Sequence, residues 1–379
     1  MSASIKSIQA FPLRYPEPHD HGALRYVTLA RVESSDGAIG WGECVSQFPE
    51  SCLAVRTIIE DGYAPLLVGR DALDVESCWY QMLDRVWWYG PQGIAAFAMS
   101  AVDMALWDLK GRLLGVPLCQ LIGGRLQDQV KAMASIHLDM GDLDWSVAEF
   151  ASFREEGYRI VKGGWGRKPP AVFGRDGPRD FDLARRIREV IGSEIDLVLD
   201  VLGGRVGWDT HTAIARVRAL EEFRLLWIEE PLPPQDYRAH ALLRSQISTR
   251  IGTGEQEWNV DGYRRLIEGG GVDVVQLDPG RAQGITGCIK AIQLIEAANL
   301  RFSAHTWSSA LNSAASVALL AASRSGWCMD FKPHESPMQH ELVEDPWIQH
   351  EGMIAVRPSP GLGVSVREAA VEKYRFGAR

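Results

Sequence analysis

Short apolar runs alternate with amphipathic segments along residues 126–355. Each run has the length of one buried strand, and the segments between the runs repeat apolar residues with a helical period. We predict barrel strands at VKAMAS, YRIVK, IDLVLD, LLWIE, RIGTG, DVVQLD, RFSAH and WCMD. We predict helices between them that include 180–192, 210–222, 236–247, 259–269 and 285–298. This alternation of strands and helices is typical of a parallel (β/α) barrel.

Residues 1–125 have a different pattern, which predicts a separate α+β domain. The segments KSIQAFPLRY and ALRYVTLARVES alternate as strands do, and Asp36-Gly37 predicts a hairpin turn before AIGWGE. We expect residues 12–25 to form a loop between the first two strands. Helical patterns cover about 51–66, 73–86 and 94–114. The tail, residues 356–379, begins with Pro and Gly residues and is expected to pack back on this first domain.

Three carboxylates stand at or just after the ends of predicted strands: Asp200, Glu229 and Glu255. They are separated by 29 and 26 residues, about one strand-helix repeat of a barrel. Barrel enzymes carry their chemistry at the C-terminal ends of the strands. Three converging carboxylates suit a hard divalent cation, for which Mg²⁺ is the natural candidate. A single strand-end carboxylate is more often a helix N-cap or a solvated charge, so the hypothesis depends on all three together.

Other ionisable residues end further apolar runs. They are Lys162, Asp278, His305 and Asp330. A carboxylate bonded to one nitrogen of an imidazole fixes its tautomer and raises the basicity of the other nitrogen. Asp278 and His305 are therefore candidates for an acid/base pair, although a histidine at a strand end is by itself more often structural. Lys162 could equally be a lysine that extends its charge from a strand end to solvent.

Composition narrows the class of protein. The formal net charge of −9 argues against a nucleic-acid-binding surface, which needs a basic face. The sequence has no apolar run of about 18 residues, so no membrane span is expected. Its start, MSASIKSIQAFPLRY, lacks the pattern of a secretory signal. The six cysteines are scattered without CxxC spacing, which indicates reduced thiols in a cytoplasmic protein.

Several motifs occur in an order that resembles one known family. The first domain carries DGAIGWGE, a WYG at 88–90 and SAVDMALWDLKGRLLGVPLCQLIGG. The barrel carries VLD, WIEEP, GTGE, QLDPGRAQGIT and SAHTW, and the tail carries PSPGLGV. Together they resemble the mandelate racemase-like branch of the enolase superfamily over essentially the whole chain. The resemblance implies an α/β fold, with an α+β capping domain (1–125) on a modified (β/α)7β TIM-type barrel (126–355) and a C-terminal segment (356–379).

The resemblance also implies roles for the strand-end residues. It assigns Asp200, Glu229 and Glu255 as Mg²⁺ ligands, and His305 with Asp278 as the acid/base dyad. Asp330 would hydrogen-bond an enediolate intermediate. Lys162 matches the first lysine of the family's Lys-x-Lys motif, but the second lysine is replaced by Gly164. The Asn that often follows the first ligand by two residues is replaced by Leu202, which changes the expected fit to substrate.

In the resembling family the loop between the first two strands folds over the barrel mouth. This makes His19, His21 and Arg25 candidates for contact with the substrate, and Trp88 and Trp307 candidates for the pocket wall. The plain alternatives are a solvated, mobile loop and tryptophans that belong to the core.

Because Gly164 removes one of two bases, the resemblance favours a reaction that needs only one. We predict a dehydratase that converts an aldonate or aldarate to a 2-keto-3-deoxy acid. A cycloisomerase acting on a sugar-acid lactone and an epimerase are the alternatives, and a non-enzymatic binding protein is a third. The expected partners are an acid-sugar substrate and further copies of the chain, with no nucleic acid and no membrane.

Overall fold

The computed structural model describes residues 3–168 and 171–377, so the outermost residues of the first and last predicted segments lie outside the described residues. Eight parallel strands follow one another around a barrel, which closes where the last pairs with the first. They are β4 (Gln129–His137), β5 (Ile160–Gly164), β6 (Asp196–Asp200), β7 (Leu225–Glu229), β8 (Ile251–Thr253), β9 (Val274–Leu277), β10 (Arg301–Ala304) and β11 (Gly326–Phe331). Each predicted strand overlaps one of these, and the predicted fold class is confirmed.

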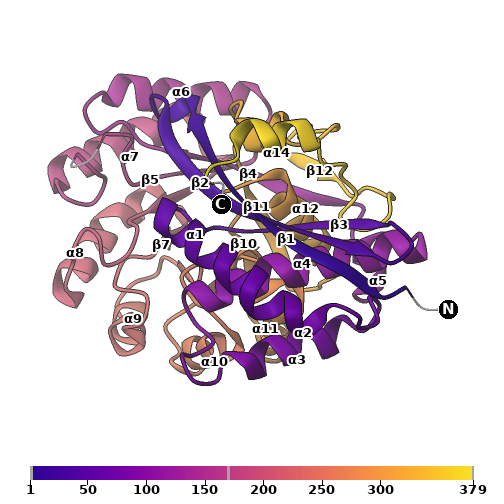
Figure 1. Ribbon diagram of the computed structural model, residues 1–379. Helices are drawn as coiled ribbons and strands as arrows, with labels where there is room; N and C mark the ends of the chain where they lie inside the picture. Colours follow the sequence, from indigo (N-terminus) through magenta and orange to yellow (C-terminus); the bar gives the residue numbers. More distant parts are fainter. Residues whose placement is uncertain (1–2, 169–170, 378–379) are drawn as a thin grey trace.

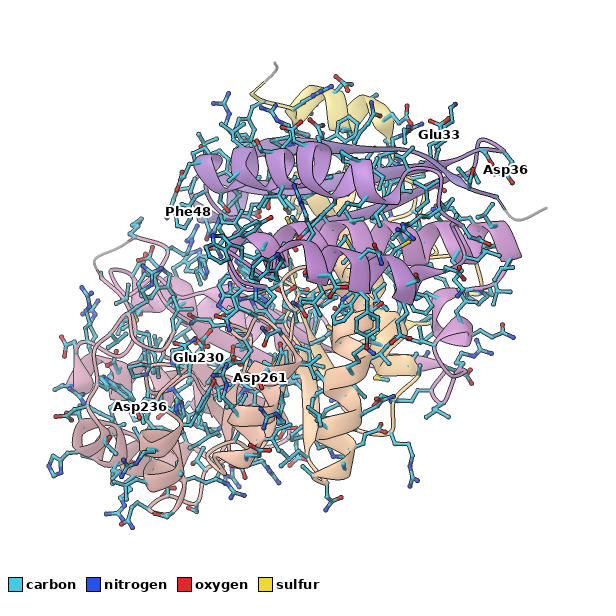
Figure 2. All side chains as sticks on the ribbon, turned by 60° about the horizontal axis from the view of Figure 1, so that its bottom comes forward. Glu33, Asp36, Phe48, Glu230, Asp236 and Asp261 are labelled. Atoms are coloured by element: carbon cyan, nitrogen blue, oxygen red, sulfur yellow. The ribbon has the colours of Figure 1, made fainter. Side chains whose placement is uncertain are left out.

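Most of the helices outside the barrel begin at a residue whose side chain caps the first turn. The helices outside the barrel are α6 (Leu143–Glu155), α7 (Gly177–Ile191), α8 (Thr210–Leu220), α9 (Tyr237–Arg244), α10 (Val260–Glu268), α11 (Gly284–Ala297) and α12 (Ala310–Ala321). The side chain of Asp236, at the start of α9 (Figure 2), accepts a hydrogen bond from the Ala239 amide and satisfies one free N–H of the first turn. α6, α7, α8 and α10 begin in the same way, at Asp142, Asp176, Asp209 and Asn259.

The barrel has an apolar interior below the C-terminal ends of its strands. Met133, Ile160, Val198, Trp227 and Val274 form a buried cluster separate from the larger core between strands and helices. Ile160 lies two residues before Lys162 on β5 and therefore faces the same way. The middle of the barrel interior is thus filled by apolar packing.

The N-terminal part folds as a three-stranded antiparallel sheet with helices on it (Figure 1). The strands are β1 (Ile5–Glu17), β2 (Ala23–Ser34) and β3 (Ile39–Cys44). The helical segments are α1 (Pro49–Thr57), a π-turn η2 (Ile58–Tyr63), α2 (Ala64–Leu67), α3 (Val75–Arg85), α4 (Ile94–Leu114) and α5 (Leu118–Leu121). We call the elements from β1 to α5 the capping domain.

The prediction of a long loop over residues 12–25 was wrong. β1 and β2 pair as far as Glu17 and Ala23, so only a tight turn remains, with the short helix η1 (Pro18–Asp20). Leu13 and Tyr15 are buried, and this apolar alternation continues the strand through Pro12 and Pro16. The hairpin therefore presents its tip as a short turn on an ordered ribbon.

The tail packs against the capping domain after the short segments α13 (Pro337–His340) and β12 (Met353–Ala355). The Leu362 amide donates to Asp108 of α4, and the last helix, α14 (Glu368–Tyr374), contacts β1. Beyond α14, the Phe376 amide donates to the Pro12 carbonyl at 3.0 Å. Within residues 3–168 and 171–377, no helix combines the length and the apolar content that crossing a bilayer requires.

β3 joins the capping domain to the barrel near the catalytic end. Gly40 and Gly42 let this strand lie directly on the backbone of α4. Next to Gly42, the buried Glu43 accepts hydrogen bonds from Ser308 and Ser309, which follow β10. Burial raises the pKa of Glu43 to about 7.

We expect Gly42→Ala to destabilise the protein, because its Cβ would overlap the backbone of Ala101 and Ala105 on α4. The loss should be roughly 1–3 kcal/mol, as for other overpacked sites, measured as a lower urea midpoint at unchanged slope. Gly62→Ala is the matched control, since its Cβ would meet only Ile58 at 3.9 Å. Equal stability of the two variants would contradict the tight contact of β3 with α4.

Candidate active site

The predicted site residues converge at the C-terminal end of the barrel. Gly164, Asp200 and Glu229 are in register on the adjacent strands β5, β6 and β7. Glu255 lies two residues after the end of β8. Asp278 and His305 each follow directly after a strand, β9 and β10.

Lys162 lies at the centre of the acidic residues. Contrary to the prediction, it does not end its strand, because β5 continues to Gly164. Its buried ammonium donates to Glu229 Oε1 and lies 3.2 Å from Asp330 Oδ1 and 3.7 Å from Asp200 Oδ2. Burial alone lowers the pKa of Lys162, but the charges of Asp330, Glu229 and Asp200 outweigh it and raise the pKa well above its usual value. Lys162 is therefore a fixed cation.

The summed negative charge of the carboxylates around Lys162 exceeds its single positive charge. Burial, followed by the charges of Glu229 and Glu255, raises the pKa of Asp200 despite the opposing effect of Lys162. The neighbouring Glu230 (Figure 2) is fully buried; Gln256 bonds its Oε2, while Oε1 has no partner among the described residues. As a set, the oxygens of Asp200, Glu229 and Glu255 do not gather within 4.8 Å of one another in the described chain. The donor set still fits a hard cation, since it consists of carboxylates with surplus negative charge.

Gly164 is required by the packing of Asp200. A Cβ at position 164 would overlap the Cβ and the backbone carbonyl of Asp200 on the next strand. The chain therefore has no room for a side chain where the family's second lysine would stand. Leu202, the other departure, adopts φ 51° and donates its amide to Asp200 Oδ1 at 2.7 Å.

His305 and Asp278 form a close pair. His305 Nδ1 lies 2.6 Å from Asp278 Oδ2, and its Nε2 lies 3.7 Å from Glu255 Oε2. The other oxygen of Asp278 accepts bonds from the Gly280 amide and the Asn312 side chain. Burial lowers the pKa of His305, but the charge of Glu255 and the bond to Asp278 raise it to about 10. Asp278 thus holds the ring by Nδ1, and Nε2 faces the acidic group.

A cavity of about 210 Å³ lies above these groups. Its lining includes Lys162, Asp200, Glu255 and His305, together with Arg25, Gln47, Ser135, Ile136, His137, Gly164, Trp165, Leu202, Arg205 and Trp307. Of the predicted substrate contacts, Arg25 and Trp307 are therefore at this cavity. His19, His21 and Trp88 are not among the lining residues. Trp88 is 82% exposed, and its ring packs edge-on against Trp87.

The sequence did not reveal several residues that shape the site. His137 ends β4, which continues past the predicted VKAMAS, and its Nδ1 lies 3.3 Å from Asp20. Asn312 was missed because α12 was not among the predicted helices. Arg205, in the loop after β6, carries no motif that separates it from a surface residue. For His137, the sequence did offer a signal, because the residues SIH continue the apolar run and end it with an ionisable residue.

The chain belongs to the enolase superfamily, in its mandelate racemase-like branch, as the motifs predicted. Residues 146–370 match the model for the enolase C-terminal domain-like family. Residues 18–123 match the model for the mandelate racemase / muconate lactonizing enzyme N-terminal domain. The two matches fall on the barrel and on the capping domain.

Individual relatives resemble the chain over nearly its full length. It is 28% identical to a D-gluconate dehydratase of Thermoproteus tenax (98% of this chain, 74% of that protein) and 26% identical to a D-galactarolactone cycloisomerase of Agrobacterium fabrum (96% of each). Among solved structures, it is similar to the 3,6-anhydro-D-galactonate cycloisomerase of Zobellia galactanivorans, with 28% identity, a TM-score of 0.89 and 99% and 100% coverage. A racemase of Streptomyces coelicolor A3(2) with bound magnesium matches with 27% identity, a TM-score of 0.85 and 98% and 100% coverage.

We expect Glu255→Gln to lower the pKa of His305 in the metal-free protein. The substitution removes the carboxylate charge 3.7 Å from Nε2, which is the largest effect raising this pKa. The change can be followed by NMR titration of the imidazole, assigned by comparison with His305→Asn. Glu368→Gln, an exposed carboxylate beside Arg31, is the control. An unchanged His305 pKa in Glu255→Gln would show that the two groups are not coupled.

Proposed function

We propose that the protein is a Mg²⁺-dependent dehydratase of an acid sugar, an aldonate or aldarate, and that it releases a 2-keto-3-deoxy acid. The observation that carries the proposal is the His305–Asp278 pair at the cavity, in which Asp278 holds Nδ1 and Nε2 lies 3.7 Å from Glu255. The similarity of the chain, over 98% of its length, to a D-gluconate dehydratase supports the reaction class.

His305 is the proposed acid and base. In the neutral form, its Nε2 accepts the proton from C2 of the substrate, and Asp278 stabilises the resulting imidazolium through Nδ1. The same proton then passes to the departing hydroxyl on C3, so one residue serves both steps. Asn312 and the Gly280 amide fix Asp278 and thereby the angle of the ring.

Asp200, Glu229 and Glu255 are the proposed ligands of Mg²⁺. When bound, the cation supplies charge stabilisation for the carboxylate of the substrate as C2 loses its proton. Lys162 adds a fixed positive charge beside Glu229 and Asp330. Asp330 is proposed to hydrogen-bond the enediolate that forms when C2 loses its proton, through a proton shared between the two groups.

The cavity wall favours an anionic, hydroxylated substrate. Arg25 and Arg205 bring guanidinium groups to it, and Trp307 offers an indole face. Arg25 is itself held by Asp20, so its position is set by the hairpin. Substrate contacts from His19, His21 and Trp88 stay a prediction, and the cytoplasmic location and the homo-oligomer stay proposals as well.

A cycloisomerase of a sugar-acid lactone is the second candidate, favoured by the two similar cycloisomerases. It would use the same proton abstraction at C2, but the leaving group would be the ring oxygen of the lactone. Water would not be lost, so the mass of the product separates the two reactions.

A library of aldonates, aldarates and their lactones, incubated with Mg²⁺, tests the proposal by detection of 2-keto products. We expect turnover of at least one aldonate or aldarate with loss of one water.

His305→Asn should reduce turnover by roughly 10³-fold or more, because it removes both acid and base, while substrate binding persists. Glu229→Gln should abolish Mg²⁺ binding in calorimetry. A His305→Asn variant that keeps more than a tenth of the rate contradicts the assignment.

Gly164 makes a separate prediction about stereochemistry. With no side chain at position 164, C2 should be deprotonated from the His305 side alone. In D₂O, proton NMR should then show exchange of one C2 epimer only, solvent deuterium at C3 of the product and no epimerised substrate. Epimerisation at C2 would reveal a second base and would change the assignment from dehydratase to epimerase.

A further inference from the structure

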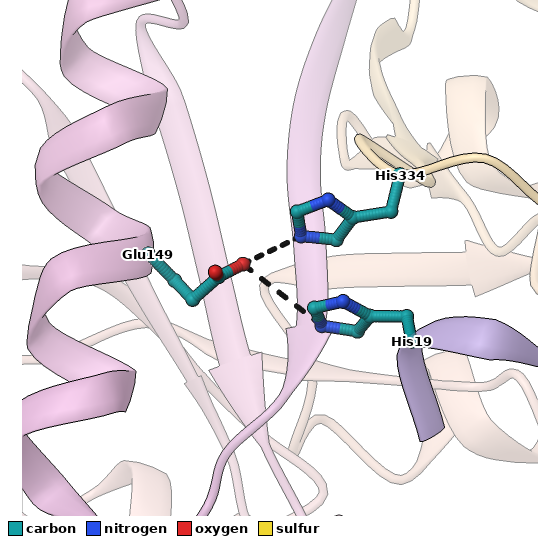
Figure 3. A group of neighbouring side chains, drawn as sticks. All are labelled: His19, Glu149 and His334. Atoms are coloured by element: carbon teal, nitrogen blue, oxygen red, sulfur yellow. Dashed lines mark hydrogen bonds and ion pairs between the residues drawn. The ribbon is translucent and has the colours of Figure 1, made fainter. Parts of the chain in front are cut away.

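A second group of potential metal ligands lies at the edge of the barrel, where the capping hairpin meets it (Figure 3). His19 comes from the turn between β1 and β2, Glu149 from α6, and His334 from the segment after β11. One ligand atom from each lies within 4.8 Å of the other two. The residues are far apart in sequence, so the fold itself assembles the group.

The geometry points to a site for a divalent transition-metal ion of the zinc class, and we propose that His19, Glu149 and His334 are its ligands. Glu149 Oε2 lies 2.5 Å from His334 Nε2 and 4.0 Å from His19 Nε2. Ligands about 2.1 Å from such an ion are at most about 4.2 Å apart, so only small side-chain movements are needed. Two imidazoles and a carboxylate favour a zinc-class ion over Mg²⁺, which prefers oxygen ligands.

The surroundings of His19 leave its nitrogen available. Its Nε2 is buried and has no hydrogen-bond partner among the described residues. Its ring stacks on His334 with centroids 3.8 Å apart and planes 17° apart, which places both Nε2 atoms on the side of Glu149. Burial and the charge of His334 lower the pKa of His19 to about 4, so the ring is neutral at neutral pH. A neutral imidazole is the form that binds a metal.

The neighbouring charges are mixed. Arg167 opposes a cation, but its guanidinium lies over the Trp145 ring at 3.8 Å and donates to the His19 carbonyl, so it also fixes the turn. Glu156 adds a nearby negative charge that interacts with Glu149 and His334. The three ligand side chains are 16%, 19% and 32% exposed, which leaves space for water at a fourth position.

Occupation of this site would tie the capping domain to the barrel. His19 stands next to Asp20, which bonds Arg25 and lies 3.3 Å from His137, two residues at the cavity. The ion would therefore fix the hairpin tip beside the substrate pocket. This inference does not depend on which reaction the cavity carries out.

The experiment is a titration of the full-length, untagged protein with Zn²⁺ or Co²⁺ in excess Mg²⁺, which occupies hard-cation sites. We expect one ion per chain, a visible absorption band with Co²⁺ and a higher melting temperature with Zn²⁺. His19→Gln and His334→Gln should each weaken binding by roughly ten-fold or more, at least the scale seen when outer partners of a metal are lost. Binding should also weaken at acid pH, where protons compete with the ion for its ligands.

Two controls separate this site from others. His21→Gln changes a histidine on the same turn that is 45% exposed, and it should bind Zn²⁺ as the wild type does. Glu229→Gln should also leave Zn²⁺ affinity unchanged, whatever it does to Mg²⁺. The proposal is overturned if no ion binds in excess Mg²⁺, if the affinity survives both ligand substitutions in folded protein, or if Glu229→Gln abolishes it.

Discussion

Surplus negative charge, buried at the C-terminal end of the barrel, is the constraint on which the site depends. Asp200, Glu229, Glu230 and Asp330 are buried there, and Lys162 forms ion pairs with Asp200, Glu229 and Asp330. Buried charges are costly unless they are paired, and the single positive charge of Lys162 balances only one of these carboxylates. Burial, followed by the charges of the neighbouring carboxylates, raises the pKa values of Asp200 and Glu230. A divalent cation relieves this excess of negative charge, which is a physical reason for a metal site independent of any relative.

The capping domain closes this charged end of the barrel by polar contacts as well as by packing. Glu43 of β3 reaches Ser308 and Ser309, just after His305, while Glu17 at the hairpin tip accepts a bond from Lys332, just after β11. Both contacts are buried. The position of the hairpin is thus coupled to the segments that follow β10 and β11, so movement of the cap and arrangement of the catalytic end cannot be independent.

The barrel was predictable because its strands are short apolar runs, and their ends fall where ionisable residues interrupt the pattern. This signal predicted Asp200, Glu229, Asp278 and His305 at or just after strand ends, where the structure has them. Both strands of the hairpin were predicted, but the loop between them was predicted too long, because Pro12 and Pro16 indicate a loop locally whereas the strands pair as far as Glu17 and Ala23. Asn312 and Arg205 act through tertiary contacts that leave no periodic trace. The lack of room for a side chain at Gly164 likewise could not be predicted, because it depends on Asp200 of the neighbouring strand.

Glu255 links the proposed cation site to the proposed acid/base residue, His305. Glu255 is both a candidate ligand and the charge that most raises the pKa of His305. A divalent cation held by Glu255 opposes that charge, so it would lower the pKa of His305 toward the neutral form that accepts a proton. Cation binding and readiness of the base are then coupled by simple electrostatics across 3.7 Å. With no room for a side chain at Gly164 and Lys162 held as a cation, this coupling would act on one face of the proposed substrate only.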